Sequence, residues 1–204
     1  LLFTLVHAAL SFNQANPPTT ELANLWSSSW TYVNISSANL TSGTSYYLTV
    51  RSVDNAVPAN DEGYYSVRSV TFTYDGTSPS VGLQAPQNNS FFNNSSVLTL
   101  SGTATDAASG VQLVQLNIND GVNYWTGADN ASGSFGSLNY VTADFSGNPT
   151  WVYRIPAVEL AQDFVNGTTY FFSARASDIS GSTSAFTAAR QIIYDVAVPS
   201  ASVT

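Results

Sequence analysis

Alternation of apolar and polar residues is the main pattern in this chain, and it predicts β-strands. In residues 43–54, GTSYYLTVRSVD, the side chains of Tyr46, Leu48 and Val50 alternate with a more polar set. A period of two residues is typical of a half-buried strand. Other segments rich in β-branched and aromatic residues predict further strands. These segments are residues 67–74, 97–106, 110–120, 167–178 and 190–194.

Helical periodicity is weak throughout. The best candidate is residues 158–164, but Asn166 and Gly167 follow almost at once, which favours a short turn. Short strands separated by turn signals every 8 to 12 residues are typical of an all-β sandwich.

The chain contains an internal repeat. Residues 43–54 and residues 167–178, GTTYFFSARASD, share Gly, Thr, Tyr, Arg and Asp at the same offsets. Further anchors occur in the same order in both halves: Trp30-Thr-Tyr32 with Trp151-Val-Tyr153, and Tyr74-Asp75 before Pro79 with Tyr194-Asp195 before Pro199. Such self-similarity predicts a repeated module, in which Trp30 and Trp151 are core residues.

We therefore predict two tandem β-sandwich domains, residues 1–78 and 79–198, followed by a strand-like tail at 199–204. The junction falls near residues 78–80. Between Pro79 and Trp151 the second copy has 71 residues, whereas only 29 residues precede Trp30. The first domain is therefore expected to lack its opening strands.

Several segments resemble bacterial Ig-like and fibronectin type III-like tandem repeats. They are PQNNSF at 86–91, SGTATDAASGV at 101–111, GTTYFFSARASDISG at 167–181 and YDVAVP at 194–199. The resemblance covers residues 79–199 and, more loosely, 30–79. Such modules occur on prokaryotic cell-surface proteins and in extracellular filaments. The resemblance implies a sandwich fold and a spacer or adhesive role, and it brings no catalytic residue.

Composition narrows the class of partner. Thirteen acidic and five basic residues make the chain only 9% charged, with a net charge of −8. Without a basic cluster the chain has nothing to neutralise phosphates, which argues against nucleic acid as a partner. No stretch reaches the 18 apolar residues of a membrane span, and residues 1–12, which include His7, predict a buried strand. The absence of Cys excludes disulfides and thiolate metal sites.

A surface with few charges and many Ser, Thr and Asn residues is common in secreted proteins. We expect an extracellular or cell-surface location and a coat of sugar. A chain of this composition also produces sequons by chance. The Asn-X-Ser/Thr sequons begin at Asn34, Asn39, Asn88, Asn93, Asn94, Asn130 and Asn166.

Catalytic chemistry finds little support. His7 is the single histidine and no Gly-X-Ser-X-Gly motif is present, so a Ser-His-Asp triad is not indicated. Loop carboxylates could form a glycosidase pair, but a sandwich with so few charges is a poor setting for one. We expect no enzymatic activity. The carboxylates in question are Asp54, Asp61 and Glu62, or Asp106, Asp120 and Asp129.

We expect no cofactor, and the alternative is a bound calcium ion. Asp75 and Asp195, where one module hands over to the next, are the weak candidates, and Asp106, Asp120 and Asp129 could share one end of the second domain. No segment has the spacing of an EF-hand loop. The simpler interpretation is that Asp54, Asp106 and Asp178 cap turns.

Sugar stacking by exposed aromatics would make the chain a carbohydrate-binding or adhesin module. Tyr124 and Trp125, among small polar residues, are the candidate pair. A core position for these two rings is the competing interpretation.

The last residues suggest self-assembly. The tail, Pro199-Ser-Ala-Ser-Val-Thr204, resembles Pro79-Ser-Val-Gly-Leu83, which opens the second domain. Inserting this tail into the next copy would be β-augmentation, and because the contact does not close it would build a filament. The alternative is a window from a longer array, with the missing strands upstream. The candidate strand residues are Pro199, Ala201, Val203, Leu2 and Leu5.

Overall fold

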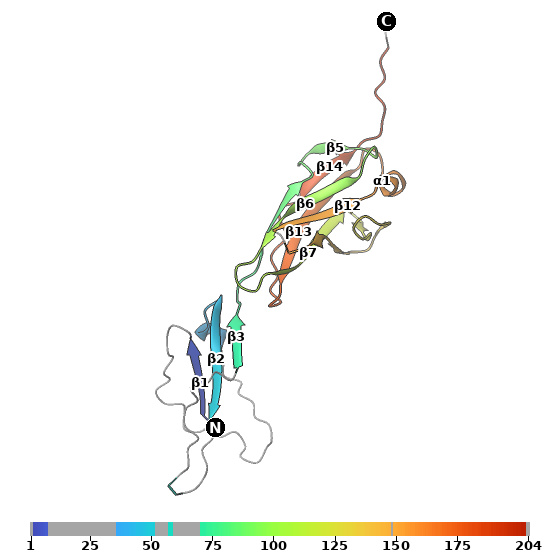
Figure 1. Ribbon diagram of the computed structural model, residues 1–204. Coiled ribbons are helices and arrows are strands. Elements are labelled where there is room, and N and C mark those ends of the chain that lie inside the picture. Colours follow the sequence, from blue (N-terminus) through green and yellow to red (C-terminus); the bar gives the residue numbers. More distant parts are fainter. Residues whose placement is uncertain (1, 8–35, 52–56, 59–69, 148, 203–204) are drawn as a thin grey trace. The chain divides into compact units, whose positions relative to one another are not determined.

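The computed structural model describes residues 2–7, 36–51, 57–58, 70–147 and 149–202. The chain divides into two compact units, unit 1 at Leu1–Gly76 and unit 2 at Thr77–Thr204 (Figure 1). Among the described residues, no helix has both the length and the apolar character needed to cross a membrane.

Unit 2 is built from two sheets, in which all strand pairs but one are antiparallel. One has the strand order β5-β14-β13-β7-β8-β9, with β10 also on β7 and β5 parallel to β14, and the other has the order β11-β12-β6-β4. The strands are β4 (Ser80–Ala85), β5 (Ser90–Phe92), β6 (Leu98–Thr105), β7 (Val111–Asn119), β8 (Tyr124–Trp125), β9 (Phe135–Gly136), β10 (Val141–Thr142), β11 (Asp144–Phe145), β12 (Thr150–Ile155), β13 (Thr169–Asp178) and β14 (Arg190–Tyr194).

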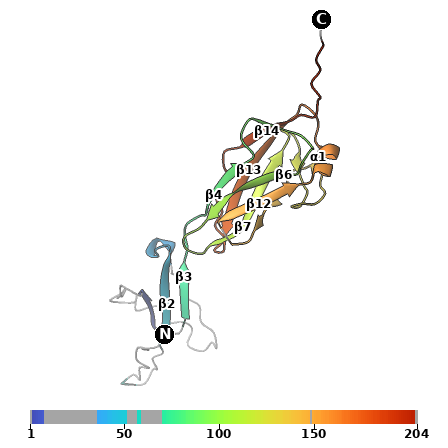
Figure 2. The ribbon, with the colours of Figure 1, turned by 45° about the horizontal axis from the view of Figure 1, so that its top comes forward.

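The order of these strands is that of an immunoglobulin-type sandwich. Strands β4, β6, β12 and β11 take the places of A, B, E and D, and strands β7, β13 and β14 take those of C, F and G. Figure 2 shows β6 and β12 crossing in front of β13 and β7. The prediction of an all-β sandwich is confirmed for unit 2.

The core of unit 2 lies between the two sheets. Strand β13 buries every second residue, as its alternation predicts, and these side chains are Tyr170, Phe172, Ala174, Ala176 and Asp178. The facing sheet contributes Leu98, Leu100, Trp151, Tyr153 and Ile155, each at most 1% exposed. Trp151 is thus a core residue, as expected, whereas its repeat partner Trp30 lies outside the described residues.

A short helix replaces the turn favoured at residues 158–164. Helix α1 (Ala157–Asp163) begins after Pro156, which supplies no side-chain cap. Leu160 in the helix and Phe164, the residue that caps its C-terminal end, are both buried. The Phe164 ring centroid is 4.3 Å from that of Tyr170. Burial of these two side chains therefore outweighs weak local signals, and the turn prediction is wrong.

Unit 1 contains a three-stranded antiparallel sheet with the order β1-β2-β3. Its elements are β1 (Leu2–His7), the 3-10 turn η1 (Ser37–Asn39), β2 (Thr44–Arg51) and β3 (Val70–Tyr74). Tyr46 of β2 is 1% exposed and stacks on Phe72 of β3 at 5.7 Å. The expected strand near the N-terminus is β1, with His7 as its last residue.

The repeat seen in the sequence is also a repeat in geometry. Tyr46 pairs with Phe72 across β2 and β3, and the equivalent Tyr170 pairs with Ile192 across β13 and β14. Each tyrosine hydroxyl accepts a hydrogen bond from the amide five residues upstream, at 2.7 Å for Tyr46 and 2.8 Å for Tyr170. This arrangement is the tyrosine corner of Ig-like sandwiches.

Candidate functional site

The same backbone hydrogen bond holds the chain in both repeats at the point where it leaves the repeat. Gly43 donates its amide to Tyr74 O at 2.8 Å, and the equivalent Gly167 donates to Tyr194 O at 2.7 Å. Both glycines have a positive φ, +77° and +80°, which other residues adopt only with strain. We call these two places the exit turns.

A side chain fixes the next residue of each exit turn. In the first, Ser42 Oγ accepts a hydrogen bond from the amide of Gly76 at 3.1 Å. In the second, Asn166 Oδ1 accepts one from the amide of Val196 at 2.8 Å. In the sequence, Ser42 was not singled out, and Asn166 was named only as a sequon. A detectable signal was present, since each is a short polar residue directly before the repeated Gly-Thr pair.

The segments that follow the two exit turns differ in their state. After the first, residues 80–85 form β4, which pairs with β6; Leu83 is 7% exposed and Val81 half-buried. After the second, residues 195–202, the exit segment, form no strand and extend away from the sandwich (Figure 1). Val198 in this segment is 89% exposed. Ala201 aligns with Val81 and is exposed, and Val203, aligned with Leu83, lies outside the described residues.

In the described part of the chain, the last strand of unit 1, β3, has fewer partner strands than its equivalent in unit 2, β14. Within the described residues, β3 pairs with β2 alone, whereas the equivalent β14 pairs with both β13 and β5. Leu2 and Leu5, the other candidates for the assembly strand, lie in β1 and face Arg51 and Leu48 of β2 across the ladder of the same chain.

Trp125 is not an exposed platform for sugar stacking. The side chain is 1% exposed, and its ring packs against Phe135 at 5.4 Å and Phe164 at 5.8 Å. Its Nε1 donates a hydrogen bond to Tyr153 Oη at 2.9 Å. The short strand β8 turns this ring into the core, so the stacking prediction is wrong for Trp125. Tyr124 beside it is half-buried.

The hydroxyl of Tyr153 is a buried link between two groups. It accepts from Trp125 Nε1 and donates to the carbonyl of Gly127 at 2.5 Å. Burial raises the pKa of Tyr153 far above its usual value; the hydrogen bond from Trp125 opposes this rise and the negative charge of Asp129 adds to it. Tyr153 therefore stays protonated as a structural donor.

The loop carboxylates do not form one cluster. Asp106 precedes β7 and Asp120 follows it, so nine strand residues separate them, or about 30 Å. The prediction that Asp106, Asp120 and Asp129 share one end is therefore wrong. Asp129 instead forms a 2.9 Å ion pair with Arg154 of β12. Asp54, Asp61 and Glu62 lie outside the described residues.

Most of these carboxylates serve turns. Burial acts to raise the pKa of Asp120, but hydrogen bonds from the amides of Asn123 and Val122 and from the Asn123 side chain outweigh it, so the pKa lies below its ordinary value.

The two calcium candidates named from the sequence, Asp75 and Asp195, also form local hydrogen bonds. Asp75 Oδ1 accepts from Ser42 Oγ at 3.1 Å, and Asp195 Oδ1 accepts from the amide of Ala197 at 2.9 Å.

The described sequons all lie on the surface. Each sequon asparagine that the structure describes is exposed, and these are Asn39, Asn88, Asn93, Asn94, Asn130 and Asn166. In Asn88, Asn93 and Asn166 the side-chain oxygen accepts a backbone hydrogen bond, so the oxygen is the atom that holds the turn. Glycosylation modifies the other atom, the nitrogen. Asn34 lies outside the described residues.

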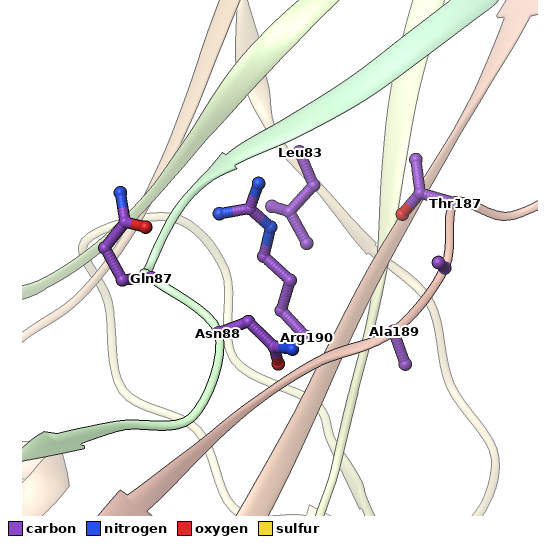
Figure 3. Close-up of a pocket in the computed structure, with 7 residues that line it drawn as sticks. Leu83, Gln87, Asn88, Thr187, Ala189 and Arg190 are labelled. Atoms are coloured by element: carbon purple, nitrogen blue, oxygen red, sulfur yellow. The ribbon is translucent and has the colours of Figure 1, made fainter.

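An open cleft of about 450 Å³ lies beside β4 and β14 (Figure 3). The Arg190 side chain enters it from β14, next to Leu83, Gln87 and Asn88. Its Nη1 donates to the carbonyls of Gln84 at 2.5 Å and Pro86 at 2.8 Å. Arg190 therefore acts as a clamp between β14 and the end of β4, and the Asn88 sequon lies on the rim.

Comparison with known proteins agrees with the strand order. The family model of the bacterial Ig domain matches residues 79–150. Unit 2 contains a bacterial Ig-like repeat. Bacterial Ig domains often occur in surface proteins.

Other comparisons add no function. No curated protein matches the chain. Among solved structures, the crystal structure of an engineered protein is similar at 13% identity, with a TM-score of 0.36 over 58% of this chain. The chain spans one fifth of the length of that structure.

Proposed function

We propose that the chain is a non-catalytic structural subunit of an extracellular or cell-surface filament, made of two tandem Ig-like modules. In this proposal the exit segment, with residues 203–204, becomes the first strand of a module in the next copy. The filament grows head to tail, and its surface carries glycans.

The equivalence of the two exit turns carries this proposal. The same glycine, the same tyrosine carbonyl and the same side-chain bond direct the chain out of both repeats. After the first exit turn, the sequence Pro-Ser-Val-Gly-Leu forms β4, with Leu83 buried in the core. After the second, Pro-Ser-Ala-Ser-Val has the same small and apolar pattern, and its described residues, 199–202, form no strand.

Physical chemistry favours a partner for such a segment. An extended segment with Val198 almost fully in water gains free energy when its apolar side chains are buried and its amides join a ladder. The edge of β3, which pairs with β2 alone in the described part of the chain, offers backbone groups of the kind that strand addition uses. A tail that enters the next head makes a heterologous contact that does not close, so the product is a filament.

We expect Val203→Asp to abolish assembly, because its counterpart Leu83 is 7% exposed and a charge cannot be buried there without a partner. Ser202→Asp is the matched control. Its counterpart Gly82 is next to the buried Leu83 in β4, and adjacent strand residues face opposite sides of a sheet, so the same charge would face outward. Light scattering after size exclusion, with electron microscopy, should show filaments for the wild type and the control. The Val203 variant should have the mass of one chain, 21.6 kDa.

Two results would contradict the proposal. Filaments that persist in Val203→Asp would show that the tail is not the donor strand. A wild-type chain that stays monomeric at high concentration would favour the alternative, in which residues 199–204 open a further module of the same polypeptide.

The glycan coat has its own test. Only 9% of residues are charged, so the hydration that keeps such a surface soluble has to come from other polar groups, and the described sequons are all exposed. We expect the intact mass of the native protein to exceed 21.6 kDa by several sugar units. Enzymatic or chemical deglycosylation should return it to the polypeptide mass. A native mass equal to that of the polypeptide would contradict the coat.

A further inference from the structure

Asp178 is a buried acid, and one of its carboxylate oxygens has no partner in the described part of the chain. The residue is 0% exposed and ends strand β13. Its Oδ1 accepts hydrogen bonds from Ser180 Oγ at 2.8 Å and from the amide of Ser182 at 2.9 Å. Its Oδ2 is buried and has no hydrogen-bond partner among the residues that the structure describes. A carboxylate oxygen in that position needs a positive group or a proton.

A second acid faces the same place. Asp106 follows β6, and a carboxylate oxygen of Asp106 lies within 4.8 Å of one of Asp178. Asp106 Oδ1 accepts three amides, from Ala108, Ser109 and Gly110, at 2.9 to 3.0 Å. Both carboxylates are therefore fixed through one oxygen, and their remaining oxygens are oriented by the protein.

The two loops that carry these acids are joined. The amide of Ile179 donates to the carbonyl of Gly110 at 3.1 Å, next to the bulge where Asp178 pairs with Val111. Gly110 and Gly181 both have a positive φ, +84° and +97°, which lets each loop turn sharply. The separation of the two carboxylates is thus set by strands β7 and β13 and does not depend on a mobile loop.

None of the described arginines in unit 2 compensates this pair. Arg154 pairs with Asp129, Arg175 donates to Gln115 and lies over the ring of Tyr140, and Arg190 donates to backbone carbonyls beside β4. Asp178 is buried and Asp106 half-buried, and two like charges held this close repel each other, which raises the need for a cation.

We propose that Asp106 and Asp178 bind a divalent cation of the calcium type at the end of unit 2 where β4 begins. Two carboxylate oxygens from separate loops, without nitrogen or sulfur ligands, are the donor set of a hard cation. Calcium accepts irregular geometry and completes its six to eight ligands with carbonyls and water, whereas magnesium requires a near-ideal octahedron.

The site would tie the loop after β6 to the loop after β13. These loops leave different sheets, since β6 belongs to the sheet of β4 and β13 to the sheet of β14. A bound cation would therefore brace the two sheets at one end of the sandwich. Binding in the native state alone raises the melting temperature in proportion to the logarithm of cation concentration.

The test uses the full chain after dialysis against EDTA, with calcium chloride added up to 10 mM. If Kd is about 1 mM, as in many extracellular modules, the melting temperature should rise by about 3–6 °C. Isothermal titration should show one site, with a weaker response to magnesium chloride. Asp178→Asn and Asp106→Asn should each lose the shift, even where the variant itself is as stable as the wild type. Asp144→Asn removes an equal charge from an exposed position and should keep the full shift.

Two outcomes would overturn the proposal. The first is a wild-type chain that does not respond to calcium or magnesium up to 10 mM. The second is a calcium shift that survives in Asp178→Asn.

Discussion

Gly102→Ala is expected to destabilise unit 2 by about 3 kcal/mol, the upper end for overpacking a core. Gly102 lies in β6 between Leu83 of β4 and Trp151 of β12 in the register of the sheet. A Cβ at this position would overlap the carbonyl oxygen of Gly82 and the indole ring of Trp151. The first of these is backbone, so the clash is relieved only if β4 moves away from β6.

Gly136→Ala is the matched control for this substitution. Gly136 also lies in a strand of unit 2, but a Cβ there would meet no atom within 4 Å. Its free energy of unfolding should stay within about 0.5 kcal/mol of the wild type. Urea unfolding followed by tryptophan fluorescence compares the three proteins. Equal stability of Gly102→Ala and the wild type would show that β4 and β6 are less tightly joined than the structure has them.

Strands were predictable here because each one carries its own signal. The alternation of Tyr170, Phe172, Ala174 and Ala176 identifies β13, and residues 190–194 match β14 to the residue. The repeat could be seen because both halves use the same tyrosine corner, which needs Gly, Thr and Tyr at fixed offsets. Local chemistry fixes these features, so they are visible in a single sequence.

Features that depend on distant partners were not predictable in the same way. Helix α1 forms because Leu160 and Phe164 find a buried aromatic cluster, a partner that the local sequence does not name. The surroundings of Trp125 are polar in sequence, yet the ring is buried because β8 pairs with β7 and β9. In the sequence, Asp178 resembled an ordinary turn cap, and its Oδ1 does cap a turn. The role proposed for its Oδ2 depends on the nearby carboxylate of Asp106, which lies in a different loop.

Tyr153→Phe is expected to cost about 2–3 kcal/mol, although it removes a single oxygen. Its loss leaves two buried groups, Trp125 Nε1 and the carbonyl of Gly127, without their hydrogen-bond partner. Removing one partner from a buried polar group costs about 1–3 kcal/mol for each group left unsatisfied. The ring itself still fills the core, so a loss of packing does not contribute.

The control is Tyr140→Phe, in a half-buried ring that packs on Phe186 at 5.3 Å and lies under Arg175. Its stability should remain within about 0.5 kcal/mol of the wild type.

The pH dependence of stability separates Tyr153→Phe and Tyr140→Phe further. Because burial raises the pKa of Tyr153 in the folded state, its contribution is complete below the unfolded value of about 10 and is lost as the pH rises above it. In Tyr153→Phe this alkaline slope should be smaller than in the wild type, while Tyr140→Phe keeps it. If Tyr153→Phe were as stable as Tyr140→Phe, the buried chain from Trp125 through Tyr153 to Gly127 would not hold β8 and its loop in the core.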